Sequence, residues 1–109
     1  MPAGYVVVFT TVPNPGEGEN IARELLDKKL AACVNTVPGI KSSYWWRGKI
    51  ENSTESLLII KTKKTLMRKL IKSVKRIHSY KVPEIISMPI SGGSKDYLDW
   101  IGSSVSNKG

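Results

Sequence analysis

The chain has 109 residues, 40% of them hydrophobic and 24% charged, which is typical of a single globular domain spanning residues 1–109 and excludes a disordered composition. Its 17 lysine and arginine residues outnumber 9 acidic residues to give a formal net charge of +8, and its single cysteine excludes an intramolecular disulfide. It has neither an apolar run of the ~18–20 residues that a membrane span needs nor a signal-peptide pattern, so we expect a cytoplasmic protein that does not enter membranes.

The first part of the chain predicts a strand followed by a helix. Residues 5–12 form a nearly continuous, β-branched apolar run, which favours a strand buried on both faces. Residues 13–18 contain prolines and glycines and predict a turn. Residues 17–29 then place four apolar side chains on one helical face: Ile21, Ala22, Leu25 and Leu26. Glutamates near the start of this segment and lysines near its end complement the helix dipole.

A long β-hairpin is predicted next. Residues 32–46 and 49–62 contain many apolar and aromatic side chains. Arg47-Gly48 between them predicts a tight turn, because glycine tolerates a positive φ. The polar residues 52–54 predict a bulge in the second arm.

The second half predicts a helix, a strand and a short helix. Residues 65–77 carry apolar side chains at three- to four-residue spacing, with Thr65 as the N-cap. Residues 84–90 predict a strand at the edge of a sheet, because the proline within it cannot donate to a ladder. Ser94 then caps a last helix, and residues 103–109 are expected to fray.

The predicted order is β-α-β-β-α-β plus a C-terminal helix, which is the α+β ferredoxin-like arrangement with one antiparallel sheet. Domains of this shape have unrelated functions, so the site residues must decide. The predicted central strands offer one aromatic side chain, Phe9, for stacking RNA bases. The loop after the first strand has neither the two cysteines of a metal chaperone nor the arginine of an acylphosphatase-like enzyme. We expect no enzyme activity.

Cys33 and His78 are the candidate metal ligands. A free cysteine is most often a small buried side chain, but its thiolate also binds soft metals such as Cu(I). His78, the single histidine, follows the basic helix, where it either caps the last carbonyl groups or binds copper or zinc. One histidine is not a metal site, so Cys33, Glu84, Met88 or a neighbouring subunit would have to complete it.

Three consecutive aromatic residues lie in the first arm of the hairpin. Tyr44, Trp45 and Trp46 alternate between the two faces of a strand, so they cannot all enter one core. An exposed aromatic side chain usually marks an interface, and the alternative is a cross-strand pair on the sheet. At least one of the three is therefore expected to be exposed in a lone chain.

The positive charge is concentrated in one segment. No acidic residue lies between Glu55 and Glu84, whereas the segment contains Lys61, Lys63, Lys64, Arg68, Lys69, Lys72, Lys75, Arg76 and Lys81. Such a segment can attract RNA, an anionic metabolite or an acidic protein, but a solvated helix face is the simpler explanation and the one we favour. Charge alone binds phosphate weakly at physiological salt, so we do not expect nucleic acid to be the partner.

Three segments together carry a family resemblance: residues 29–35 (KLAACVN), 44–50 (YWWRGKI) and 78–84 (HSYKVPE). The match continues through Lys61-Thr62, Pro89 and the segment YLDWI near the C-terminus. In this order and at these spacings they resemble the CutA family of small divalent-cation tolerance proteins. No single motif among them is a catalytic signature, and the specificity lies in their joint occurrence.

The resemblance implies a tight homotrimer in which the long hairpin, with its aromatic residues, pairs with neighbouring subunits. It also implies a cleft between subunits lined by Lys61, His78, Tyr80 and Glu84. The implied function is divalent-cation tolerance, with copper as the first metal to test. The alternative is a trimeric signalling module that binds a small anionic ligand in this cleft, through Lys61 and residues 16–18.

Overall fold

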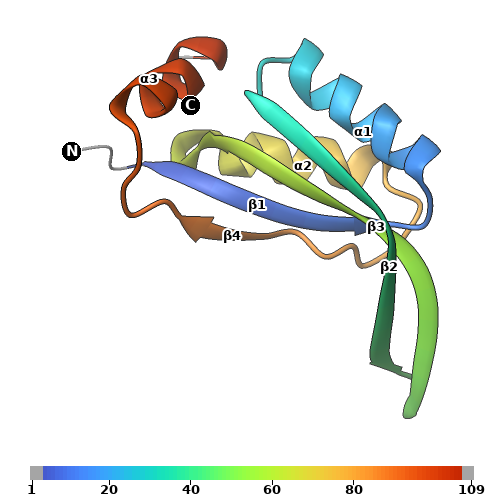
Figure 1. The fold of residues 1–109 in the computed structure, drawn as a ribbon. Coiled ribbons are helices and arrows are strands. Elements are labelled where there is room, and N and C mark those ends of the chain that lie inside the picture. The colour runs from blue at the N-terminus through green and yellow to red at the C-terminus, as the bar shows by residue number, and fades with distance from the viewer. Residues whose placement is uncertain (1–3, 107–109) are drawn as a thin grey trace.

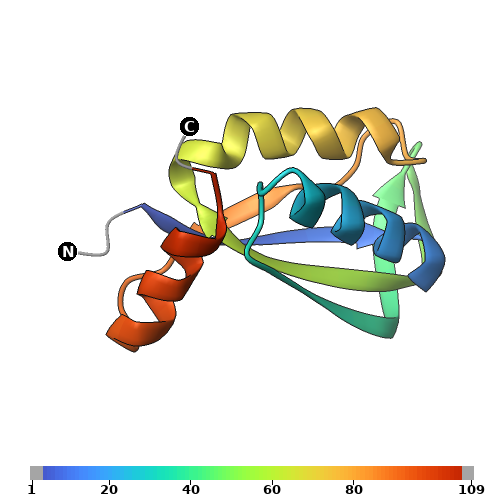
Figure 2. The same cartoon turned by 90° about the horizontal axis from the view of Figure 1, so that it is seen from above.

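The computed structural model describes residues 4–106. The elements in chain order are β1 (Tyr5–Val12), α1 (Pro15–Asp27), β2 (Cys33–Trp46), β3 (Lys49–Lys63), a 3₁₀ turn (Lys64–Leu66), α2 (Met67–Ile77), β4 (Ile86–Pro89) and α3 (Lys95–Ser104). The antiparallel sheet has the order β2-β3-β1-β4, and α1 and α2 lie side by side on one of its faces (Figures 1 and 2). This confirms the predicted ferredoxin-like arrangement. No helix among the described residues is long and apolar enough to cross a membrane.

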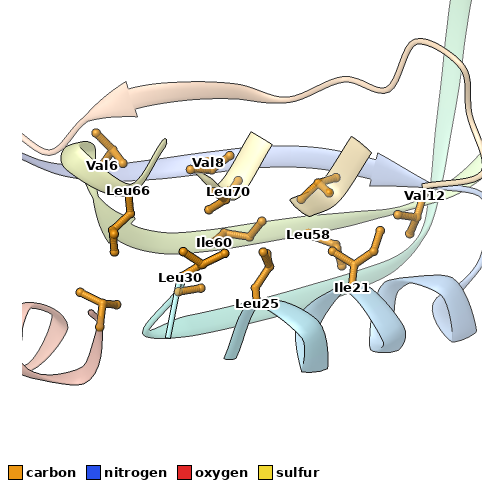
Figure 3. Packing of buried hydrophobic residues seen from close by; sticks show 13 residues of the cluster. Val6, Val8, Val12, Ile21, Leu25, Leu30, Leu58, Ile60, Leu66 and Leu70 are labelled. Carbon is orange, nitrogen blue, oxygen red and sulfur yellow. The ribbon is translucent and has the colours of Figure 1, made fainter. Parts of the chain in front are cut away.

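The core lies between the sheet and these two helices (Figure 3). Val8 of β1 and Ile60 of β3 are cross-strand neighbours, and both are fully buried. The fully buried apolar side chains of the core include Val8, Val12, Ile21, Leu25, Leu58, Ile60, Leu66, Leu70 and Val74. Burying one such side chain contributes about 1.5–3 kcal/mol, so this layer holds the single chain together.

The opposite face of the sheet is not covered by α1 and α2. Val7 and Phe9 of β1 and Ile59 of β3 are only half-buried there. Ile86 and Met88 of β4 are 52% and 43% exposed. The expectation that β1 is buried on both faces is therefore met on one face only within a single chain.

The predicted hairpin is present, and its arms project beyond the rest of the molecule (Figure 1). Arg47 and Gly48 both have positive φ, 51° and 79°, as a two-residue type I′ turn requires. The ladder irregularity lies in β2 between Val37 and Ile40, and not at residues 52–54 as predicted. The intervening proline has no N–H to donate, and the glycine after it has a φ of 71°.

Helix α1 begins at Pro15, earlier than the predicted start at residue 17. The Asn14 side chain accepts a hydrogen bond from the N–H of Glu17 at 2.8 Å, and proline suits the first helical position because that N–H has no partner within the helix. Residues 16–18 therefore belong to the first turn of a helix and not to the predicted loop. Gly18 is buried there, where an added Cβ would lie 3.1 Å from Leu58.

The second half follows the prediction with corrected boundaries. Thr65 lies within a 3₁₀ turn and gives α2 no side-chain cap, contrary to the prediction. Strand β4 is shorter than the predicted range 84–90, but it lies at the edge of the sheet as its proline required. Ser94 caps α3 as predicted, its hydroxyl accepting an N–H at 3.5 Å.

The segment after α3 is more ordered than the prediction of a frayed 103–109 tail. Val105 is only 5% exposed. The N–H of Ser106 donates to the carbonyl of Lys29 at 2.9 Å, which holds the chain against the end of α1. Residues 107–109 of the predicted tail lie outside the described residues.

Candidate functional site

His78 follows α2 and is a buried hydrogen-bonding residue. Its side chain has no exposed surface. The backbone N–H of Tyr80 donates to Nδ1 at 3.0 Å, so the ring proton is on Nε2, which donates to the carbonyl oxygen of Thr11 at 2.8 Å. Glu17 lies 3.4 Å from Nδ1, but its carboxylate accepts the N–H of Ser79 at 2.8 Å and forms no ion pair with this neutral tautomer. His78 thus joins the end of α2 to the end of β1 with both ring nitrogens engaged.

Tyr80 continues this arrangement toward the hairpin. Its hydroxyl donates to Oε2 of Glu55 at 2.7 Å, and Glu55 on β3 is only 8% exposed. Burial, followed by the hydrogen bond from and the charge of Glu55, raises the pKa of Tyr80 well above its ordinary value. The His78 and Tyr80 rings lie 4.8 Å apart between centroids. The segment after α2 is thus fastened to β1 and β3 at the base of the hairpin arms.

A groove of about 860 Å³ opens beside this tyrosine, between the β2 arm and the segment after α2. Both acidic and basic side chains line it, together with hydroxyl groups and aromatic rings. The lining residues are Thr11, Lys41, Ser42, Ser43, Tyr44, Trp46, Glu55, Tyr80, Lys81, Val82 and Glu84. A concave surface that combines polar groups with aromatic rings is the usual form of a small-ligand site.

The structure divides the four residues of the predicted cleft. Tyr80 and Glu84 both line the groove of the single chain. His78 is buried and does not line it, and Lys61 lies elsewhere on the sheet. Within one chain, the groove therefore contains two of the four residues that were predicted to line the cleft.

Lys61 belongs to a second polar cluster, at the end of the sheet where β2 begins. In the ladder it is opposite Cys33, and its ammonium donates to the side-chain carbonyl of Asn35. The same ammonium lies 3.9 Å from the sulfur of Cys33. Burial, and then the Cys33 thiol, raises the pKa of Tyr97 on α3, which places this tyrosine beside the cluster.

The two predicted metal ligands, Cys33 and His78, are not brought together within one chain. Cys33 is aligned through Lys61 with Val7 of β1, whereas His78 bonds to Thr11, four residues further along that strand. Four strand residues span about 13 Å. Across residues 4–106, no group of three or more histidine, cysteine or acidic side chains could hold a metal ion.

The aromatic residues of the arm are exposed, on both faces. Tyr44, Trp45 and Trp46 are 42%, 73% and 50% exposed. Tyr44 and Trp46 line the groove, whereas Trp45 lies opposite Ile50, which is 62% exposed, on the other face of the ribbon. The expected exposure of an aromatic side chain in a lone chain is confirmed.

Sequence reasoning missed Glu55, Lys41 and Asn35. Glu55 had a signal, since it is a carboxylate two residues before the start of the apolar run of β3, where a buried charge needs a partner. Lys41 and Asn35 had none that a sequence pattern could reveal. Their positions follow from the β2–β3 register, which depends on the irregularity in β2.

Comparison with known proteins identifies the family of almost the whole chain. The family model described as CutA1 divalent ion tolerance protein matches residues 6–104. The chain is 50% identical over 99 residues to the chloroplastic protein CutA 1 of Oryza sativa subsp. japonica, covering 91% of this chain and 56% of that protein. It is 48% identical over 98 residues to the divalent-cation tolerance protein CutA of Archaeoglobus fulgidus, covering 90% and 95%.

Solved structures of CutA1 proteins have the same fold as this chain. The crystal structure of CutA1 from Oryza sativa superposes with a TM-score of 0.95 at 46% identity, covering 99% of this chain and 100% of that one. The CutA1 structure from Thermus thermophilus superposes with a TM-score of 0.92 at 42% identity, covering 94% and 99%. The chain thus spans only 56% of the full length of the chloroplastic rice relative, whereas its alignment covers all of the crystallised rice CutA1 chain. It belongs to the CutA1 divalent ion tolerance protein family.

Proposed function

We propose that this chain contributes to divalent-cation tolerance and does so by binding a ligand, not by catalysing a reaction. In this proposal it is a homotrimer in the cytoplasm. The observation that carries the proposal is the groove beside Tyr80, where acidic, basic and aromatic side chains meet between the β2 arm and the segment after α2. In the proposed trimer, a second subunit packs against this groove and adds side chains to it. Relatives named divalent-cation tolerance protein support the functional part of the proposal.

Exposed apolar surface supports the assembly. Within residues 4–106, the outer edges of β2 and β4 pair with no further strand. An edge of this length, carrying Trp45 and Trp46, would be prone to uncontrolled pairing if it stayed open. Pairing the arms of neighbouring subunits would cover these edges and the apolar face that includes Ile86 and Met88.

Copper is the cation to test first. Coordination through His78 would cost one of its two internal hydrogen bonds. Glu84 lines the groove and is exposed, so its carboxylate, together with the same carboxylate of neighbouring subunits, is the better-placed oxygen ligand for Cu(II). Cys33, as a thiolate, would suit Cu(I) instead.

Glu84→Gln is therefore expected to weaken Cu(II) binding about tenfold, because it removes an exposed ligand charge without disturbing the core. Calorimetric titration of untagged protein measures this. Glu51→Gln is the matched control, an exposed carboxylate of the arm that does not line the groove. Equal losses in the two variants would contradict a site in the groove. If Cu(II) affinity falls only in His78→Gln or only in Cys33→Ser, the metal binds at that residue instead.

A second candidate is a small anionic ligand in the same groove, as in a signalling module. Two lysines, Lys41 and Lys81, line the groove from opposite sides and favour an anion. Lys61, the anion contact first expected, is far from the groove lining and bonds to Asn35. Calorimetry with Lys41→Gln separates the two candidates. This variant removes a positive charge from the groove, so it would weaken the binding of an anion and would not weaken the binding of a cation.

A further inference from the structure

A second hollow, of about 350 Å³, lies on the helical side of the molecule, between the end of α1 and one face of α2. The α2 residues that line it lie at positions i, i+3, i+4 and i+7 and therefore share one face: Lys69, Lys72, Ser73 and Arg76. The residues after α1 and the segment after α3 supply the remaining walls: Lys28, Leu30 and Ser106. We refer to this hollow as the cationic pocket.

The charges around the cationic pocket are unbalanced. Among the described residues that line it, four side chains are cationic and none is acidic. One carboxylate, Glu24 of α1, lies beside it and accepts hydrogen bonds from Lys28 at 2.6 Å and from Arg76. The hydroxyl of Ser73 also donates to Glu24, at 3.2 Å. A single carboxylate thus orients three donors at the edge of the pocket: Lys28, Ser73 and Arg76.

The donors of this pocket match an anion with several oxygen atoms. Guanidinium and ammonium groups form charge-assisted hydrogen bonds to phosphate oxygens, and each carries more than one N–H donor. The hydrogen bonds to Glu24 hold Lys28, Ser73 and Arg76 together before any ligand arrives, which lowers the entropic cost of binding. The cations of α2 that would extend the patch, Arg68 and Lys75, do not line the hollow.

We propose that the cationic pocket binds a phosphate-class oxyanion, either free or carried by a nucleotide. A concave pocket of this size fits one or two phosphate groups. Single-stranded RNA, in contrast, follows an extended groove with aromatic rings for its bases, and no aromatic side chain within residues 4–106 lines this pocket. The pocket is separate from the groove beside Tyr80 and has different lining residues, so this proposal does not depend on the proposed cation function.

The test is calorimetric titration of the full chain with sodium pyrophosphate and, in a separate arm, with ATP, at ~0.15 M salt. Lys72→Gln is expected to weaken pyrophosphate binding about tenfold, because it removes one charged donor from the lining. Lys75→Gln removes the same charge from an exposed position of α2 outside the lining and is expected to change the affinity less than about twofold. Equal affinities for the two ligands identify the free oxyanion, and tighter ATP binding identifies a nucleotide.

Glu24→Gln provides an independent arm. The amide is neutral and still accepts hydrogen bonds, so pyrophosphate is expected to bind several-fold more tightly once the competing charge is removed. Absence of saturable pyrophosphate binding, equal losses in Lys72→Gln and Lys75→Gln, or weaker binding by Glu24→Gln would each overturn the proposal. Binding of a short single-stranded RNA that is reduced equally by both lysine variants would also overturn it, in favour of an extended basic surface.

Discussion

Replacing His78 with alanine is expected to lower the free energy of unfolding by about 3–4 kcal/mol. The side chain has no exposed surface and serves two backbone groups, the carbonyl of Thr11 and the N–H of Tyr80. Alanine would leave the buried carbonyl of Thr11 and the partly buried N–H of Tyr80 without these partners and would open a cavity at the end of α2. Urea denaturation, followed at several protein concentrations because assembly also contributes to stability, measures the effect.

A graded control accompanies this variant. His78→Gln keeps an amide that can donate to the carbonyl of Thr11, so it is expected to lose about half as much stability as alanine. A loss below about 1 kcal/mol for His78→Ala would show that the two hydrogen bonds contribute little. It would also make His78 available as a ligand, as the residue pattern first suggested.

Replacing Trp45 with aspartate is expected to dissociate the proposed trimer without unfolding the chain. Trp45 is 73% exposed and faces Ile50 at the end of the arms, away from the core, so the charge would not enter the folded chain. A central tryptophan at a protein interface contributes about 2–4 kcal/mol, and a buried aspartate would add a desolvation cost. Trp46→Ala is expected to loosen the assembly to a lesser extent.

Sedimentation velocity at micromolar protein distinguishes the species, and circular dichroism reports whether the chain remains folded. Leu26→Asp is the matched control, since Leu26 is a 42% exposed apolar side chain on α1, outside the hairpin. It is expected to leave the mass unchanged. If Trp45→Asp and wild type sediment alike, the arms do not form the interface.

Much of the fold could be predicted because local patterns and packing agree. The apolar stripe of α2, the Arg47-Gly48 turn and the cap at Ser94 each depend on residues within one turn of each other. The predicted boundaries are wrong where the same residue types are common in two kinds of structure. Prolines and glycines at residues 13–18 are typical of a turn, but Pro15 is also a favoured first residue of a helix, and Asn14 caps that helix.

The candidate site was harder to predict because it depends on register and on distant contacts. Lys61 and Tyr80 were both predicted to line the cleft as polar side chains. The ladder places Lys61 opposite Cys33, whereas Tyr80 bonds to Glu55 near the base of the arms. His78 has the residue type of a metal ligand, and only the positions of Thr11 and the Tyr80 amide reveal that both nitrogens are engaged. No sequence pattern encodes either arrangement directly.

The mass of the wild-type protein in solution is the most direct test that the groove is completed by neighbouring copies of the chain. Sedimentation equilibrium at micromolar concentration is predicted to give three times the 12.1 kDa mass of the chain, with no dissociation on dilution through that range. This result follows if the exposed arms and the uncovered sheet face are buried between subunits. A stable species of 12.1 kDa would contradict it, and the groove beside Tyr80 would then have to bind its ligand with the residues of one chain alone.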